Sequence, residues 1–260
     1  MALKVPERGR IDIHNSVARL SAYLAQPREG HLRAALHMFS CLKNGGHQLL
    51  PFDPMMPVME GDYAIPEMDD GIMEIWKNFY RDAEDEKPLD MPKALGGAVR
   101  IYCFVDADHA GDKLTRRSYT GIIIKINNAV IFSFSKRQTT VEAATFGSEL
   151  IAARVAKEKI QALLYKLRMM GVPVISPSVM IVDNESVVKS VSVPESRLKK
   201  KHLSICYHAV REAVAAGIIT VMWVKSEDNL ADICTKIMSG MTLKRILSYL
   251  LIPRRLKQTQ

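Results

Sequence analysis

Four carboxylates in this sequence stand where strands are expected to end or helices to begin. Asp106 and Asp183 each close an apolar run, Glu149 falls in the first turns of a long helical stretch, and Asp232 falls early in the last helix. In open α/β sheets, strand ends and helix starts meet at one edge, so these four acids can converge there. Clustered carboxylates repel one another, and hard divalent cations such as Mg²⁺ or Mn²⁺ relieve that repulsion.

Such a cluster has a definite chemistry. Two cations held about 3.5–4 Å apart activate water on one side of a phosphodiester and stabilise the leaving oxygen on the other. The alternative for any single acid is an ordinary turn or helix-capping role, the commoner one for an Asp after a strand. Asp108 follows Asp106 by two residues, so spacing leaves open which of the two is the ligand.

Charge is unevenly distributed along the 260 residues, whose formal net charge is +8. Residues 51–92 contain twelve acidic and three basic residues, so this stretch carries −9 and the remainder carries +17. A basic chain of this kind favours a polyanionic partner such as nucleic acid or an acidic membrane surface.

The cysteines and the apolar runs indicate the compartment. Four scattered cysteines without a CxxC pattern are typical of reduced, intracellular thiols rather than a disulfide framework. No apolar run approaches the roughly 20 residues of a membrane span, and the first ten residues lack the apolar stretch of a secretory signal. We therefore expect an intracellular protein that is not secreted and has no membrane partner.

Apolar periodicity divides the chain into a helical start, an irregular middle and a mixed α/β part. Helical spacing covers residues 12–42, where Pro27 and Gly30 separate two helices. Residues 47–97 are rich in proline, with one aromatic island at 75–80 that we interpret as a docking anchor. Beyond Val99 the expected order is three strands, a helix, a strand, two helices, a strand and a helix. Eight of these nine elements have assigned ranges, because only one of the two helices before the last strand is given bounds. The ranges are 100–105, 120–126, 129–135, 141–170, 179–182, 199–216, 218–224 and 228–238.

Seven segments of this α/β part are collinear with motifs of one family. They are Phe104–Gly111, Thr115–Gly121, Ser135–Val141, Ser148–Ala152, Ile181–Ser186, Lys201–Leu203 with Arg211–Glu212, and Leu230–Lys236. Together they resemble the ribonuclease H domain of copia-type retrotransposon polyproteins, in which the first segment reads D-A-D-W-A-G and the last L-A-D-I-x-T-K. His109 replaces the usual Trp, and Ile237 replaces the usual Pro, but every acid of the pattern is kept.

The resemblance implies a ribonuclease H-like fold, a mixed five-stranded sheet flanked by helices, here with a small N-terminal helical segment. It implies cleavage of the RNA strand of an RNA–DNA hybrid with two Mg²⁺ or Mn²⁺ ions. Carried over by position, Asp106, Glu149, Asp183 and Asp232 would be both the catalytic residues and the metal ligands.

The first part of the chain resembles a different piece of the same polyprotein. Arg10–Ile13, Val17, Leu20 and the Leu42–Lys43 pair resemble the segment that closes the reverse transcriptase domain. The Y-x-D-D motif of a polymerase site is absent, so we expect no polymerase site here. We expect a C-terminal fragment of a Pol polyprotein whose reverse transcriptase portion is a partner. The predicted division is a reverse transcriptase remnant at 1–46, an acidic tether at 47–97, the ribonuclease H domain at 98–252 and a basic tail at 253–260.

Basic and polar residues around the acids are candidates for nucleic-acid contacts. We predict such contacts for Arg116, Arg117, Lys136, Arg137, Asn184, Lys199, Lys200, Lys201 and His202. The alternative for the cluster at 199–202 is a solvated helix face. A zinc site built from His202, Cys206 and Cys234 is disfavoured because a fourth ligand at finger spacing is missing.

Two other functions compete with the hybrid-specific endoribonuclease. One is a catalytically inactive nucleic-acid-binding remnant of a retrotransposon polyprotein that keeps fold and charge. The other is an integrase or transposase, which shares the fold but ends its acid triad with a glutamate, whereas the last acid here is Asp232. For the nuclease, we expect a location in the cytoplasm, within a virus-like particle, or in the nucleus.

Overall fold

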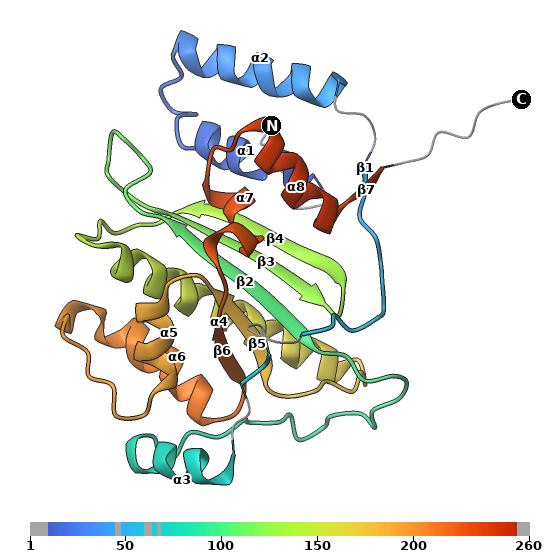
Figure 1. Cartoon of the computed structure of the whole chain (residues 1–260), viewed down its shortest axis with the longest axis vertical. Coiled ribbons are helices and arrows are strands. Elements are labelled where there is room, and N and C mark those ends of the chain that lie inside the picture. The colour runs from blue at the N-terminus through green and yellow to red at the C-terminus, as the bar shows by residue number, and fades with distance from the viewer. Residues whose placement is uncertain (1–9, 45–47, 60–63, 67–68, 254–260) are drawn as a thin grey trace, which may run out of the picture.

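A five-stranded mixed sheet forms the centre of the protein (Figure 1). The structure is a computed structural model that describes residues 10–44, 48–59, 64–66 and 69–253. The strands are β2 (Ile101–Asp108), β3 (Tyr119–Ile126), β4 (Ala129–Arg137), β5 (Ser178–Val182) and β6 (Ile219–Trp223). Their order across the sheet is β4-β3-β2-β5-β6. The first three are antiparallel and β5 and β6 run parallel to β2, so the expected mixed five-stranded sheet is confirmed.

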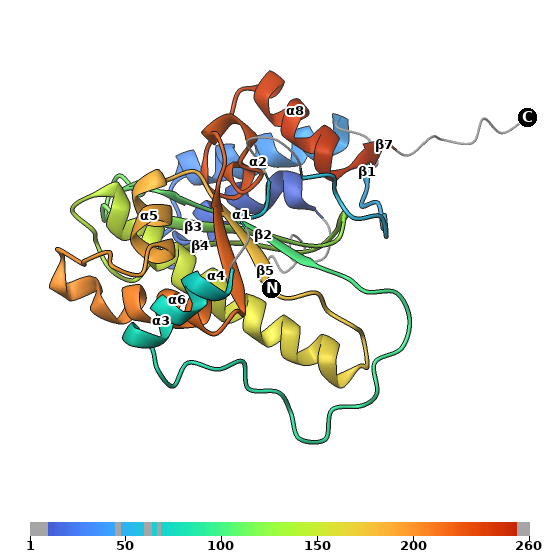
Figure 2. The same ribbon diagram turned by 60° about the horizontal axis from the view of Figure 1, so that its bottom comes forward.

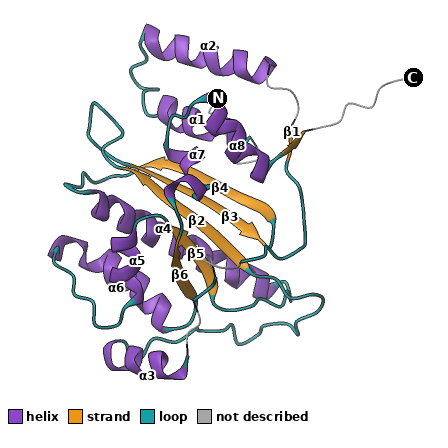
Figure 3. Cartoon of the chain, viewed as in Figure 1, coloured by secondary structure: helices purple, strands orange, loops and turns teal. Residues whose placement is uncertain are grey.

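Helices cover both faces of this sheet (Figure 3). One face packs against α4 (Thr145–Met169), and α5 (Glu185–Ser192) and α6 (Ser204–Ala215) complete that layer. The other face packs against α1 (His14–Ser21), α7 (Asp232–Thr235) and α8 (Gly240–Leu250). Because both faces are covered, central strands are apolar without alternation: Ile122, Ile123 and Ile124 of β3 are all buried.

A tight turn at Asn127–Asn128 connects β3 to β4 in a hairpin. Asn127 has a φ of +52°, a left-handed conformation that asparagine tolerates better than most residues. Its side chain accepts a hydrogen bond from the backbone of Arg100 at 2.9 Å and donates one to the carbonyl of Pro54 at 2.7 Å. This turn therefore also fixes part of the predicted acidic tether at 47–97, called the acidic segment from here on, against the sheet.

The C-terminal helices differ from their predicted form. The helix predicted at 228–238 is a 3-10 turn at Ser226–Asp228 followed by the four-residue α7. Helix α8 was not predicted, although Ser239 caps it by accepting a hydrogen bond from the backbone of Thr242 at 3.3 Å. Its apolar face is buried with Ile123 of the sheet. The break between α7 and α8 turns the chain, and local helical spacing contains no signal for that turn.

The first helix packs directly on the sheet. His14 Nδ1 lies 2.9 Å from Ser133 Oγ of β4, and Asn15 donates a hydrogen bond of 2.8 Å to the carbonyl of Lys236. Helix α2 (Glu29–Asn44) packs on α1, and several of its apolar side chains stay exposed, namely Leu32, Leu36 and Phe39. The short strands β1 (Gln48–Leu49) and β7 (Ile252–Pro253) pair with each other. The predicted boundary at residue 46 stays a prediction, and residues 254–260 of the predicted basic tail lie outside the described residues.

The aromatic island of the acidic segment lies on helix α3 (Asp70–Phe79), which packs against α6. Trp76 is 1% exposed and belongs to the main apolar core. The guanidinium of Arg211, itself buried on α6, lies 4.6 Å from the centre of the Trp76 ring. The same guanidinium donates to the carbonyls of Ser190 and Val193, both at 2.8 Å. Along the part of the chain that the structure describes, no helix is long and apolar enough to cross a membrane.

This packing predicts that two aromatic residues of one helix differ sharply in their effect on stability. Trp76→Ala should lower the free energy of unfolding by about 3–5 kcal/mol, because it leaves a cavity in the core and removes the ring over Arg211. Phe79→Ala should cost about 1 kcal/mol or less, because Phe79 is 53% exposed. Urea unfolding of both variants measures the difference. Equal, small effects would mean that the acidic segment does not contribute to the core.

Candidate functional site

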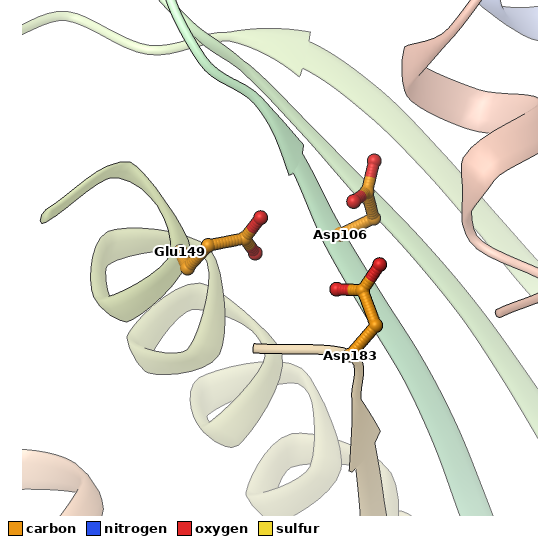
Figure 4. A group of neighbouring side chains, drawn as sticks. All are labelled: Asp106, Glu149 and Asp183. Carbon is orange, nitrogen blue, oxygen red and sulfur yellow. The ribbon is translucent and has the colours of Figure 1, made fainter. Parts of the chain in front are cut away.

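Three of the four predicted acids meet at one edge of the sheet. One carboxylate oxygen each of Asp106, Glu149 and Asp183 lies within 4.8 Å of the other two. Figure 4 shows the three side chains pointing toward one another from β2, from α4 and from the end of β5. The register explains two of them: Val105 pairs with Val182, so the next residues, Asp106 and Asp183, stand side by side on parallel strands.

Glu149 is the most confined of the three. Its side chain reaches the cluster from the second turn of α4, and the residue is 7% exposed. Burial, together with the negative charges of Asp106 and Asp183, raises the pKa of Glu149 well above its ordinary value. Its buried Oε2 atom has no hydrogen-bond partner among the residues that the structure describes. A buried carboxylate oxygen without a partner, aimed at two other carboxylates, fits a hard divalent cation as the missing neighbour.

The fourth predicted acid, Asp232, lies beside Asp106 but outside the group of three. Lys236 connects the two acids, since its Nζ lies 2.6 Å from Asp232 Oδ1 and 3.5 Å from Asp106 Oδ1. Burial and the charge of Asp106 raise the pKa of Asp232 to about 7. Burial lowers the pKa of Lys236, but the charges of Asp106 and Asp232 outweigh it, and the pKa lies above its ordinary value. The ammonium therefore neutralises part of the cluster.

A close approach of α7 to the sheet positions Asp232. Gly121 of β3 pairs with Asp106 in the register, and α7 lies directly over it. A Cβ atom at Gly121 would stand 2.5 Å from Thr235 Cγ2 and 2.9 Å from the carbonyl oxygen of Ala231. Glycine therefore lets Thr235 come near enough to donate a hydrogen bond to the carboxylate of Asp106.

The two candidate aspartates on β2 have different partners. Asp106 is 1% exposed and faces the acid cluster. Asp108 instead forms an ion pair with Arg19 of α1. Arg19 also donates to the carbonyl oxygens of Thr235, at 2.7 Å, and Gly111, at 3.2 Å. In this arrangement Asp106 is the candidate ligand and Asp108 holds the N-terminal helix.

The predicted nucleic-acid contacts fall into two groups. Lys136, Arg116, Lys199 and Lys201 are exposed, as expected for residues that contact phosphates, whereas Arg117 and Lys200 are half-buried. Arg137 forms an ion pair with the buried Asp112. Asn184 caps α5 by accepting hydrogen bonds from the backbone of Ser186 and Val187, at 3.1 and 3.3 Å.

Sequence reasoning missed the partner of His202. Its Nε2 lies 3.0 Å from Oε2 of Glu142, a buried residue in the loop before α4. A Cβ atom at Gly147 would stand 2.4 Å from the same Glu142 oxygen. Glu142 therefore packs against the first turn of the helix that carries Glu149. The two residues lie 60 positions apart, so local sequence patterns contain no signal for this contact.

An open hollow of about 350 Å³ lies against the cluster. Glu149, Asp183 and Asn184 line it together with polar side chains from the start of α4, the start of α5 and the loop after β6. Glu149 and Asp183 thus face an open hollow that is lined by polar side chains, which suits a charged substrate.

Comparison with known proteins supports the family resemblance. The chain is 28% identical over 159 residues to the Retrovirus-related Pol polyprotein from transposon RE1 of Arabidopsis thaliana, covering 61% of this chain and 11% of that protein. It is 29% identical over 134 residues to the corresponding polyprotein from transposon TNT 1-94 of Nicotiana tabacum, covering 52% and 10%. The similarity to retrotransposon Pol polyproteins is thereby confirmed, and the chain spans about a tenth of the length of these relatives. No protein-family model matches the chain.

Among solved structures, ribonuclease H domains are similar at low identity. The N-terminal RNase H domain of Rv2228c from Mycobacterium tuberculosis has a TM-score of 0.41 and 13% identity, covering 58% of this chain and 97% of that one. LC11-RNase H1, isolated from compost by a metagenomic approach, has a TM-score of 0.42 and 16% identity, covering 57% and 98%.

The raised pKa values predict how the metal-free protein responds to pH. Folded Glu149 and Asp232 bind protons more tightly than they do unfolded. Their contribution to stability is therefore present below about pH 4. It is lost as pH rises through the pKa of each folded group, which is about 7 for Asp232 and well above its ordinary value for Glu149. In EDTA, the Tm of Glu149→Gln minus that of the unmodified protein should grow from pH 5 to pH 8, because the amide removes one charge of the cluster.

Magnesium gives the complementary measurement. At pH 8, millimolar Mg²⁺ should raise the Tm of the unmodified protein more than that of Glu149→Gln, since an amide replaces one charged ligand. A pH-independent difference between the two proteins, with no response to Mg²⁺, would contradict the interpretation of this cluster as a metal site.

Proposed function

We propose that this protein is an endoribonuclease that cleaves the RNA strand of RNA–DNA hybrids with two Mg²⁺ or Mn²⁺ ions. The observation that carries the proposal is the convergence of Asp106, Glu149 and Asp183 within 4.8 Å of one another, with Asp232 beside Asp106 and a hollow against Glu149 and Asp183. A cluster of this composition suits phosphodiester hydrolysis, because carboxylate oxygens are the ligands that hard divalent cations prefer and two such cations promote this reaction.

The similarity to retrotransposon Pol polyproteins supports the substrate and the setting. Reverse transcription of such an element passes through an RNA–DNA hybrid, whose RNA strand has to be removed. We propose that the chain acts in that process together with the reverse transcriptase portion of a parent polyprotein. The corresponding location is the cytoplasm, within a virus-like particle, or the nucleus.

The chain's own residues provide ligands and binding surface. Asp106, Glu149 and Asp183 would hold the ions, with Asp232 as a further ligand. When bound, divalent ions supply an activated water and stabilise the leaving oxygen. Asn184 lines the hollow beside Glu149 and Asp183, where a substrate phosphate would lie, and its amide is already oriented by its bonds to the first turn of α5.

The alternative function is a catalytically inactive nucleic-acid-binding remnant. One observation favours it: Lys236 places an ammonium between Asp106 and Asp232, which replaces part of the positive charge that a metal would bring. A metal-dependent cleavage assay on hybrid, duplex RNA and duplex DNA separates the two functions. Cleavage of the hybrid alone supports the nuclease, and binding without cleavage supports the remnant.

Asp183→Asn tests the metal site directly. The change keeps the shape of the side chain and removes one ligand charge, so cleavage of a hybrid in Mg²⁺ should fall by about a hundredfold or more. Binding of the same hybrid in EDTA should change little. The control is Glu158→Gln, which changes an exposed carboxylate of α4 that pairs with Arg154. This variant should keep full activity. Near-normal turnover of Asp183→Asn would remove Asp183 from the site.

The lysines at 199–201 test the binding surface. Replacing all three with Ala should reduce the slope of log affinity against log salt by up to about 2–3, because each lost phosphate contact removes about 0.7–0.9. The matched control replaces the exposed Lys77, Lys87 and Lys93 of the acidic segment, which changes the net charge equally. Equal slopes in the two triple variants would mean that these lysines, which lie before α6 rather than on the predicted helix, are only a solvated surface.

A further inference from the structure

Helix α3 lies beside α6 (Figure 2), and a second cavity lies next to their contact. Its volume is about 510 Å³, within the range of small-molecule sites. It opens between the end of α3, the loop before α6 and the first turns of α6. None of its lining residues belongs to the acid cluster.

The lining combines aromatic rings with positive charge. Phe79, Tyr80 and Tyr207 contribute rings, and Arg197 and Lys201 contribute charged side chains, with Arg211 at the buried end. Among the described residues that line the cavity, none is acidic. An aromatic group attached to an anion therefore matches this lining, because the rings offer stacking surfaces and the cations pair with the charge.

The aromatic walls are held in place, and one of them is open to solvent. Tyr80 Oη lies 2.7 Å from His208 Nδ1 and accepts a hydrogen bond from Arg211 Nε at 3.2 Å. Trp76, one helical turn earlier on α3, is buried and anchors the helix. Phe79 lines the cavity and is 53% exposed. Because the buried Trp76 already anchors α3, the fold does not require an aromatic residue at position 79.

We propose that this cavity binds an unpaired nucleotide of a single-stranded extension of the RNA–DNA hybrid. That the nucleotide belongs to an RNA–DNA hybrid rests on the proposed function. That the cavity suits an aromatic group with a phosphate rests only on its lining residues. A nucleotide supplies an aromatic base for Phe79 and Tyr80 and a phosphate for Arg197 and Lys201. Stacking of this kind tolerates any base sequence, because every base presents a flat ring face.

The continuity of positive charge favours a nucleic acid over an acidic, aromatic peptide. Lys201 lines the cavity, and the next residue, His202, contacts Glu142 before α4. The basic run 197–202 thus leads from the cavity to the end of α4 that carries Glu149. A strand with a phosphate at every nucleotide can follow such a run from the acid cluster into the cavity.

Binding of matched hybrids in EDTA tests the proposal without cleavage. The probes are a blunt hybrid and the same hybrid with a four-nucleotide single-stranded extension, compared by fluorescence anisotropy. The extension should tighten binding about tenfold, and Phe79→Ala should abolish that gain while leaving affinity for the blunt hybrid unchanged. Tyr249→Ala, at an exposed aromatic residue on α8, is the control and should keep the gain. No gain in the unmodified protein, or a full gain in Phe79→Ala, would overturn the proposal.

Photo-crosslinking tests binding in the cavity independently of whether the protein cleaves hybrids. A single-stranded hexanucleotide with 5-iodouracil at each position is irradiated with the full chain, and the crosslinked peptide is identified by mass spectrometry. Crosslinks at Phe79, Tyr80 or Tyr207 support the cavity even if no hybrid is cleaved. Crosslinks elsewhere, or displacement of the oligonucleotide by an acidic aromatic peptide but not by other nucleic acid, contradict it.

Discussion

The mutual repulsion of clustered carboxylates is the constraint on which the rest of this structure depends. Asp106, Glu149 and Asp183 come from three different elements, and two of them, Asp106 and Glu149, are buried. Parallel pairing of β2 with β5 fixes two of them side by side, and packing of α4 on the sheet brings the third. Lys236 partly offsets the repulsion by placing a positive charge against Asp106 and Asp232. The fold therefore holds in place an arrangement that its own electrostatics oppose.

Contacts around α7 hold the acids in place despite their repulsion. The side chain of Asn229, before α7, donates a hydrogen bond of 2.9 Å to the carbonyl of Val105 on β2. Gly121 leaves room for the helix on β3, and Asn15 and Arg19 of α1 bind the carbonyls at its end. The N-terminal helix thus contributes to the geometry of the acids, although it lies more than eighty residues before the first of them.

Local patterns predicted the strands and the acids, because β-branched runs and residues at strand ends are visible within a few positions. Strand β3 was predicted at 120–126 and is Tyr119–Ile126, and the meeting of Asp106 with Asp183 follows from strand order and register. Contacts between distant residues were beyond local patterns. The pairs Asp108–Arg19 and His202–Glu142 join residues 89 and 60 positions apart. The tertiary structure alone decides such partners, so the sequence left Asp106 and Asp108 equivalent.

The same reasoning explains why a count of basic residues predicts a binding surface only in part. Arg19, Arg137 and Arg168 pair with aspartates, and Arg211 holds backbone carbonyls in the core, so these cations stabilise the fold. The planar guanidinium suits such sites because it donates several hydrogen bonds in fixed directions and is weakly hydrated. The lysines at 199–201 form no ion pair with the described residues. A lysine ammonium is strongly hydrated and stays in solvent, where a phosphate can reach it. Arg19, Arg137, Arg168 and Arg211 therefore stabilise the fold, whereas Lys199 and Lys201 stay exposed.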